Sequence, residues 1–213
     1  MKAYLFALTL ALGINTASAA TPLDVSIAQL QHEWAAANYQ TPEKEREAAL
    51  EKVVKEAHQV TAANPGRAEP LIWEGIITST LAKYQSKLAA GGTAKAARDL
   101  LQAAEKIDPN ALEGSALTSL GSLYYKVPRF ISFGDHDKAR EYLERALKIN
   151  PNGIDQNYFY ADFLLEEGEY AKALEHFKKA LNAPARPGRE DADLGRHGDI
   201  NEGIKKAEKK LQH

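Results

Sequence analysis

The amino-acid sequence predicts an all-α fold, a short right-handed superhelical solenoid of about four helix pairs with a capping helix at the C-terminus. The first observation behind this prediction is that helices end repeatedly in the same way, at "VTAANP", "AEKIDP" and "ALKINP". The second is that "KAREYLERALKINP" and "KALEHFKKALNAPA" match position by position at an offset of 34 residues. One helix pair cannot bury its apolar face alone, so repeated pairs are expected to stack into a continuous core.

Residues 1–19 are expected to be a secretory signal peptide. Lys2 precedes the apolar run "AYLFALTLALGI", and the small residues Ala17, Ser18 and Ala19 follow it. A charged start, an apolar middle and a small-residue exit are typical of a cleaved export signal. The mature chain would then begin at Ala20 and be periplasmic or secreted. The apolar run is too short to span a bilayer, and the sequence has no cysteine for a lipid anchor.

The helical repeat domain is predicted to run from residue 20 to residue 184. Its first unit is a degenerate one, with a proline in the first turn of its second helix at "TPEKE" and another proline at its end. A proline closes the later units as well, because it lacks the N–H of a continuing helix and disfavours helical geometry in the residue before it. The predicted units are residues 25–65, 68–109, 114–151 and 154–184.

Small side chains recur at fixed positions within these units. In the second helices, alanines stand seven residues apart, which puts them on one helical stripe. Two antiparallel helices approach closely only where side chains are small, so these positions are predicted to be structural. They are Ala97, Ala104, Ala139, Ala146, Ala173 and Ala180, together with Gly121 and Ala161 of the first helices.

Residues 185–213 are predicted to form a linker and a C-terminal capping helix. The linker "ARPGREDADLGRHG" is rich in proline, glycine and arginine. In the following "DINEGIKKAEKKLQ", Ile200, Ile204, Ala207 and Leu211 make one narrow apolar stripe opposite lysines. Such a helix suits the end of a solenoid, because it covers the last repeat and presents charge to water.

Two stretches are longer than the repeat allows. The stretch "AKYQSKLAAGGTAK" is expected to prolong a helix to Leu88 and to end it at Gly91 or Gly92. The stretch "YKVPRFISFGDHDKA" carries Phe130 and Phe133, whose apolar surface must either pack over the repeat edge or bind something.

Nothing in the sequence predicts catalysis or a cofactor. The six histidines show no ligand spacing, and neither a nucleophile elbow nor a phosphate-binding loop is present. Asp135, His136 and Asp137 stand together as metal ligands would, yet Asp137 is equally suited to cap the following helix, and we expect no metal. Basic residues number 27 against 29 acidic ones, which gives no electrostatic basis for binding nucleic acid or an anionic membrane.

The repeat resembles the tetratricopeptide repeat. The segments "LTSLGSLYY" and "NYFYADFLL" carry the small residue of the first helix, Gly168 and Tyr170 supply the turn, and alanines and a closing proline follow. This resemblance implies a non-enzymatic scaffold that binds a protein or peptide in a concave groove lined by the first helices. The groove residues that it implies are Ile72, Ile76, Thr118, Ser122, Tyr125, Tyr158, Asp162 and Leu165.

The stretch "VPRFISFGDHDKAREYLERAL" also resembles the T-component of tripartite periplasmic transporters. That resemblance implies a second function, an accessory protein that binds a small hydrophobic ligand, with Phe130 and Phe133 at its site. A ligand site should be an enclosed apolar pocket, whereas a peptide site should be an open groove.

Overall fold

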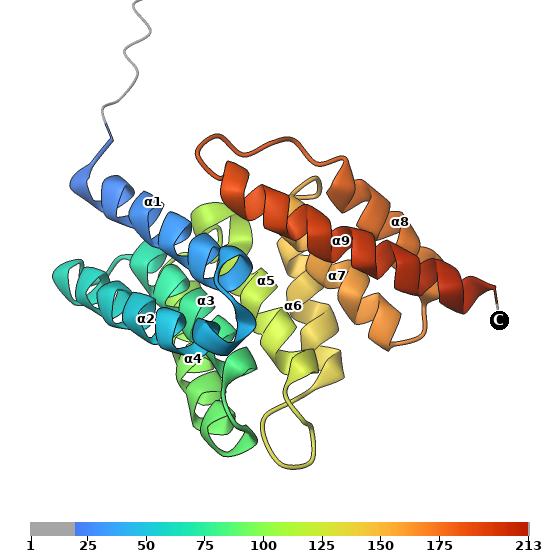
Figure 1. Ribbon diagram of the computed structural model, residues 1–213, viewed down its shortest axis with the longest axis horizontal. Helices are drawn as coiled ribbons and strands as arrows, with labels where there is room; N and C mark the ends of the chain where they lie inside the picture. Colours follow the sequence, from blue (N-terminus) through green and yellow to red (C-terminus); the bar gives the residue numbers. More distant parts are fainter. Residues whose placement is uncertain (1–19, 213) are drawn as a thin grey trace, which may run out of the picture.

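The computed structural model describes residues 20–212, which contain helices and no strand (Figure 1). The expected signal peptide lies outside these residues. Four helix pairs and a final single helix follow one another, as the repeat predicts. The helices are α1 (Pro22–Ala35), α2 (Arg46–Ala63), α3 (Ala68–Tyr84), α4 (Lys87–Ile107), α5 (Ala111–Lys126), α6 (His136–Ile149), α7 (Ile154–Glu166), α8 (Tyr170–Leu181) and α9 (Glu190–Leu211).

Side chains that accept backbone N–H groups define where helices begin. At α1, the Thr21 hydroxyl accepts the N–H of Asp24 at 3.2 Å, and the Asp24 carboxylate accepts the N–H of Thr21 at 2.8 Å. This reciprocal pair is a capping box. At α6, the capping residue is Asp135, whose Oδ1 accepts two backbone N–H groups at 3.1 Å. The prediction that Asp137 caps this helix is therefore wrong, because α6 begins at His136 and Asp137 lies inside its first turn.

The break between α3 and α4 also differs from the prediction. We expected one helix to continue to Leu88 and end at the glycine pair, but α3 ends at Tyr84 and the glycines lie inside α4. Ser86 explains the break, because its backbone is extended and its hydroxyl accepts the N–H of Ala89 at 3.5 Å. A serine in this position starts a new helix.

Close approach of paired helices requires small residues at their crossing points. A Cβ added to Gly75 of α3 would lie 2.7 Å from Leu101 Cγ of α4, and one added to Gly121 of α5 would lie 2.5 Å from Leu143 Cγ of α6. Such distances are too short for carbon atoms. The six alanines predicted to be structural in the second helices are fully buried, namely Ala97, Ala104, Ala139, Ala146, Ala173 and Ala180.

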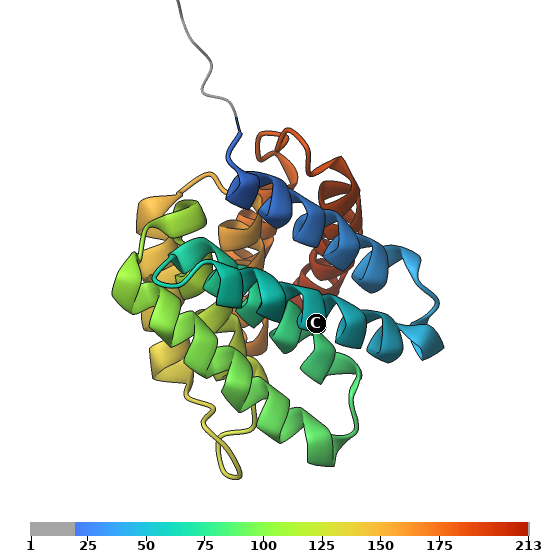
Figure 2. The same cartoon turned by 90° about the vertical axis from the view of Figure 1, so that its left-hand side faces the viewer.

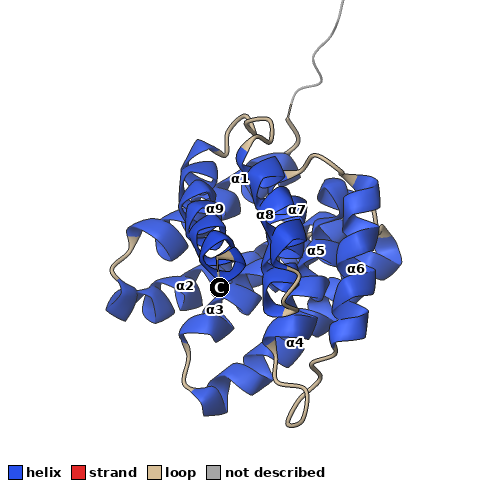
Figure 3. Ribbon diagram, turned by 90° about the vertical axis from the view of Figure 1, so that its right-hand side faces the viewer, coloured by secondary structure: helices blue, strands red, loops and turns tan. Residues whose placement is uncertain are grey.

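The first helices of the four pairs lie side by side, and α9 continues their row. Each of α1, α3, α5, α7 and α9 contacts the next, and α9 also contacts α1. Figures 2 and 3 show α9 passing beside α1 at one side of the molecule. These five helices, which we call the inner helices, therefore close into a ring.

The capping helix is longer than expected, because it begins at Glu190 within the stretch predicted to be a linker. Two glycines in it permit close packing. A Cβ on Gly195 would lie 2.3 Å from the ring of Tyr39, and one on Gly203 would lie 2.4 Å from the ring of Phe177. Gly195, which lies in the stretch predicted to be a linker, is thus a helical residue at a contact point.

The apolar core has two parts. One is built by α1, α2 and α3 around Trp34 and Trp73, and Ala192 of α9 joins it. The other begins at Ala68 and Ile72 of α3 and extends through α4 to α9, and Ile76 and Leu112 pack against both. Among the residues that the structure describes, no helix is long and apolar enough to cross a membrane.

Candidate binding surface on the inner helices

The eight predicted groove residues all lie on inner helices, but they differ in the surface that they offer. Ile72, Thr118 and Tyr125 are buried. The half-buried ones are Ile76, Ser122, Tyr158, Asp162 and Leu165. A partner that binds without rearranging the helices can contact only the five half-buried residues. The binding role of all eight residues stays a prediction.

Tyr125 and Asp162 meet across the boundary between the third and fourth helix pairs. The Tyr125 hydroxyl donates a hydrogen bond of 2.8 Å to Asp162 Oδ2, and Lys126 Nζ lies 2.8 Å from the same oxygen. Burial, and then the charge of Asp162, raises the pKa of Tyr125 well above its ordinary value, so the hydroxyl remains a donor. Ser122 and Leu165 lie one helical turn from this contact, one on each helix.

Tyr158 faces α9 rather than an open groove. The guanidinium carbon of Arg196 lies 4.3 Å from the centre of the Tyr158 ring and 4.8 Å from that of Phe159. On α8, the ring of Phe177 has its centre 6.0 Å from that of Tyr158. Burial raises the pKa of Tyr158, and the Arg196 charge opposes this rise. The capping helix therefore occupies the space in front of this predicted groove residue.

Arg196 belongs to a network of ion pairs that fixes α9 to α7. Its Nε lies 2.8 Å from Asp155 Oδ1, and its Nη1 lies 3.0 Å from Asp199 Oδ2. Arg186, in the segment before α9, reaches the second oxygen of Asp155 at 2.6 Å and also pairs with Asp193. Sequence reasoning missed this network, for which the arginines and acidic residues close together in "REDADLGRHGD" are the visible signal.

The electrostatics of this network centre on Asp155. Burial alone would raise the pKa of its carboxyl group. The charges of Arg186 and Arg196 outweigh burial and hold the pKa of Asp155 well below its ordinary value. Asp155 therefore stays ionised at neutral pH and keeps both arginines in place.

Polar contacts also join α9 to α1 and to the π-helical turn Ala36–Gln40 that follows α1. The Tyr39 hydroxyl donates a hydrogen bond of 3.0 Å to Asp199 Oδ2. His32 Nδ1 lies 2.9 Å from Asp191 Oδ2. The chain's own side chains thus fill part of the inner surface that a partner was expected to occupy.

The α5–α6 turn places the two predicted ligand residues in different environments. The ring of Phe133 packs edge-on against Tyr124, with centres 5.7 Å apart, and beneath the guanidinium of Arg98 at 4.6 Å. Phe130, in contrast, is 96% exposed. One phenylalanine therefore packs over the repeat edge while the other stands in solvent, and their role in binding a ligand stays a prediction.

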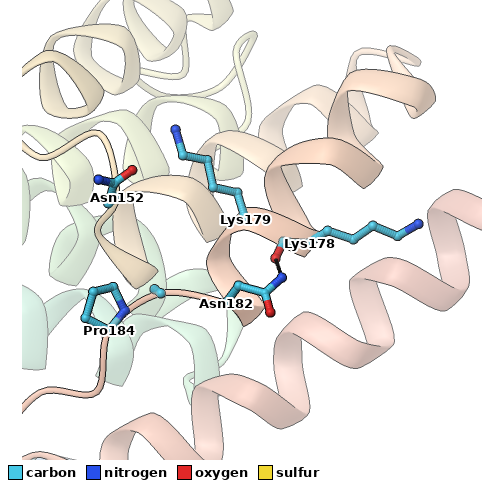
Figure 4. A pocket seen from close by; sticks show the side chains of 6 residues that line it. Asn152, Lys178, Lys179, Asn182 and Pro184 are labelled. Atoms are coloured by element: carbon cyan, nitrogen blue, oxygen red, sulfur yellow. Dashed lines mark hydrogen bonds between the residues drawn. The ribbon is translucent and has the colours of Figure 1, made fainter.

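Two surface depressions lie away from these residues. One, of about 500 Å³, lies at the C-terminal end of α8, where Lys178 and Lys179 extend into solvent in different directions (Figure 4). The other, of about 330 Å³, lies between α1 and α2 and is lined in part by Gln29 and Glu56. Neither depression includes a predicted groove or ligand residue.

The polar residues of the α5–α6 turn take structural roles. Asp135 caps α6, and His136 Nδ1 lies 2.6 Å from Glu167 Oε1. Within residues 20–212, no three histidine, aspartate or glutamate side chains are grouped so that they could hold a metal ion.

Known proteins resemble this chain in both sequence and fold. Residues 130–192 match the sequence model of the tetratricopeptide repeat family. The tetratricopeptide repeat and J domain-containing co-chaperone DNJ1 of Cryptococcus neoformans var. grubii serotype A is 34% identical over 86 residues, which are 40% of this chain. The chain spans only 15% of the length of that relative.

Two solved structures are similar to this chain at low sequence identity. TTC0263, a thermophilic tetratricopeptide repeat protein of Thermus thermophilus, superimposes with a TM-score of 0.56 at 16% identity, over 85% of this chain and 90% of its own. MamA superimposes with a TM-score of 0.45 at 20% identity, over 79% of this chain and 93% of its own. Residues 130–192 therefore match the tetratricopeptide repeat in sequence, and the arrangement of the helices resembles that of a solved tetratricopeptide repeat protein.

Proposed function

We propose that the chain is a non-enzymatic scaffold that binds a protein or an extended peptide on its inner helices. The observation that carries this proposal is the surface formed by Ser122, Asp162 and Leu165, which are half-buried on adjacent inner helices. We call these three residues the α5–α7 surface. It lies beside the hydrogen bond between Tyr125 and Asp162, which fixes the spacing of the two helices.

The chemistry of the α5–α7 surface favours a partner of mixed character. Ser122 offers a hydroxyl, Asp162 a carboxylate and Leu165 an aliphatic side chain. A segment with one apolar residue between hydrogen-bonding groups complements such a surface. The name of the co-chaperone relative supports a protein as the class of partner, although it describes a much longer chain.

The compartment in which the scaffold works is a second part of the proposal. The pattern of residues 1–19 supports export to the periplasm or secretion, with cleavage after Ala19. The partner would then be another exported protein.

Site-specific photocross-linking tests the binding surface. A photoreactive phenylalanine derivative replaces Ser122 or Leu165 in turn, and the full chain is irradiated with extract from the compartment where it resides. We expect both positions to cross-link to the same segment of one partner, as identified by mass spectrometry.

Leu194 provides the matched control, because it is 76% exposed on the inner helix α9 but lies away from the α5–α7 surface. The same derivative at position 194 should give no such product. Equal cross-linking from position 194, or none from positions 122 and 165, would contradict the proposed surface.

A further inference from the structure

Exposed apolar side chains gather at one end of the molecule. Phe130 is 96% exposed and Ile131 is 85% exposed, both at the apex of the α5–α6 turn. Leu88, in the first turn of α4, is 94% exposed. Figures 1 and 2 show that the α5–α6 turn and the start of α4 project at the same end of the molecule. We call these three residues the apolar tip.

The α5–α6 turn is built to display its apex. The N–H of Ser132 donates to the carbonyl oxygen of Pro128 at 3.1 Å, which closes the chain around the apex. At the base, the N–H of Asp135 donates to the carbonyl oxygen of Tyr124 at 2.8 Å. Phe133 packs beneath Arg98 as described above. Because the base is fixed by packing and hydrogen bonds, exposure of the apex is a property of the folded turn.

Charge is segregated around the apolar tip. From residue 75 to residue 98 the sequence has four basic residues and no acidic one, and from residue 114 to residue 134 it has two basic residues and no acidic one. These are the segments that carry Leu88 and Phe130. The near-neutral balance of the whole chain therefore hides a local excess of positive charge at this end.

The cations nearest the tip are available to a ligand. Lys87 and Arg129 are exposed, and neither forms an ion pair with another residue in the range 20–212. Acidic side chains of the neighbouring α7–α8 turn are already neutralised, since Glu166 pairs with Lys126 and Glu169 pairs with Arg140. Repulsion of an anionic surface by these carboxylates is thereby reduced.

We propose that the apolar tip docks on an anionic lipid membrane, with Phe130, Ile131 and Leu88 entering the interface and Lys87 and Arg129 contacting lipid headgroups. A protruding apex can insert into a membrane without a preformed pocket, because lipids rearrange around the inserted side chains. A protein partner would need a pocket that receives two separate projections. Aromatic and aliphatic side chains beside unpaired cations are the combination that peripheral membrane binding uses.

The expected binding is weak and reversible. A few apolar side chains at the interface give marginal affinity on their own, and anionic headgroups supply the remainder through the basic residues. Binding should therefore require anionic lipid and should weaken as salt screens the surface charges. The site is separate from the α5–α7 surface, so the proposed scaffold function does not depend on it.

Tryptophan fluorescence of Phe130→Trp in the full chain tests this proposal. The two native tryptophans, Trp34 and Trp73, are buried and give a constant background. Vesicles of mixed phosphatidylglycerol and phosphatidylcholine should shift the emission from position 130 to shorter wavelength, and vesicles of phosphatidylcholine alone should not. Leu194→Trp is the matched control and should not respond to either vesicle.

Sedimentation with the same vesicles measures the contribution of each group. Phe130→Ser should weaken binding by about tenfold or more. Lys87→Gln and Arg129→Gln should each weaken it by about fivefold at low salt. All variants share residues 1–19, so that segment cannot account for differences among them.

Three results would overturn the membrane proposal. The first is unchanged emission from position 130 in the presence of anionic vesicles, and the second is an equal shift from position 194. The third is that Phe130→Ser abolishes cross-linking to a protein partner while position 130 shows no response to vesicles, which would assign the tip to a protein.

Discussion

Tyr125 Oη lies 2.8 Å from Asp162 Oδ2, and this hydrogen bond joins two inner helices that belong to successive repeats. Tyr125 is buried and the Asp162 carboxylate is charged, so this hydrogen bond is stronger than one between two neutral groups. We predict that Tyr125→Phe lowers the free energy of unfolding by about 1–2 kcal/mol, measured by urea denaturation.

Tyr160→Phe is the control for this substitution. Its hydroxyl makes a longer bond of 3.3 Å to the exposed Glu144, so its loss should change stability by less than about 0.5 kcal/mol. If the two variants were equally stable, the bond between α5 and α7 would not be a significant link between repeats.

A second prediction concerns the crossing of α7 and α8. Ala180 is fully buried where the fourth pair packs together. Ala180→Leu should overpack this site and lower the free energy of unfolding by about 1–3 kcal/mol. Ala171→Leu, on the exposed face of the same helix, should leave the stability nearly unchanged. A melting temperature unaffected by Ala180→Leu would be inconsistent with the register of the repeat.

The repeat could be predicted from the sequence because its physical basis is local. Small residues such as Gly121 recur wherever two neighbouring helices cross, and the large residue that fills the space, Leu143, lies only one helix further on. A regular spacing in the sequence therefore reports the packing of each pair directly. The same reasoning found the inner helices and the order in which they follow one another.

The closed ring could not be predicted, because its contacts are distant in sequence and not periodic. His32 and Asp191 are 159 residues apart, and neither belongs to a repeated pattern. The sequence around Gly195 predicts a linker because glycine is typical both of flexible linkers and of points of close approach, and in the structure Gly195 meets the ring of Tyr39. The covering of Tyr158 by Arg196 follows from this ring closure.

A third prediction tests the network that holds α9. Arg196→Met leaves the half-buried Asp155 with one of its two arginines, and should lower the free energy of unfolding by about 3 kcal/mol. Lys205→Met, on the same helix in an exposed ion pair, should cost less than about 1 kcal/mol. Chemical denaturation of both variants measures the difference, and similar losses would show that the network does not anchor the helix.

The pH dependence of stability provides a fourth prediction. Because arginines hold the pKa of Asp155 below its ordinary value of 3.8, its contribution to stability is present above pH 3.8 and is lost as the pH falls below it. Asp155→Asn should therefore be less stable than the parent chain at pH 6, and the difference should shrink as the pH falls below about 4. Denaturation curves between about pH 3 and pH 7 span this ordinary pKa and measure the convergence.

Asp99→Asn is the control for the loss of stability at low pH. Asp99 is exposed on α4, and its ion pair with Arg98 should contribute less than about 1 kcal/mol at any pH. A constant difference between Asp155→Asn and the parent chain across the whole range would contradict the assigned role of the Asp155 carboxylate.

The last prediction concerns the N-terminus of the exported chain. Cleavage after Ala19 would leave Ala20 as the first residue and would keep Thr21, the N-cap of α1, together with its partner Asp24. Mass spectrometry of the exported protein should therefore find an N-terminus at Ala20 or Thr21. Replacing Ala19 with arginine should block processing, because the exit of an export signal requires small residues. As a structural control, Thr21→Ala should be processed normally but should lower the free energy of unfolding by about 1 kcal/mol, since the N-cap is lost. Recovery of the unmodified chain from the cytosol with Met1 intact would contradict export, and the partner should then be sought in the cytosol.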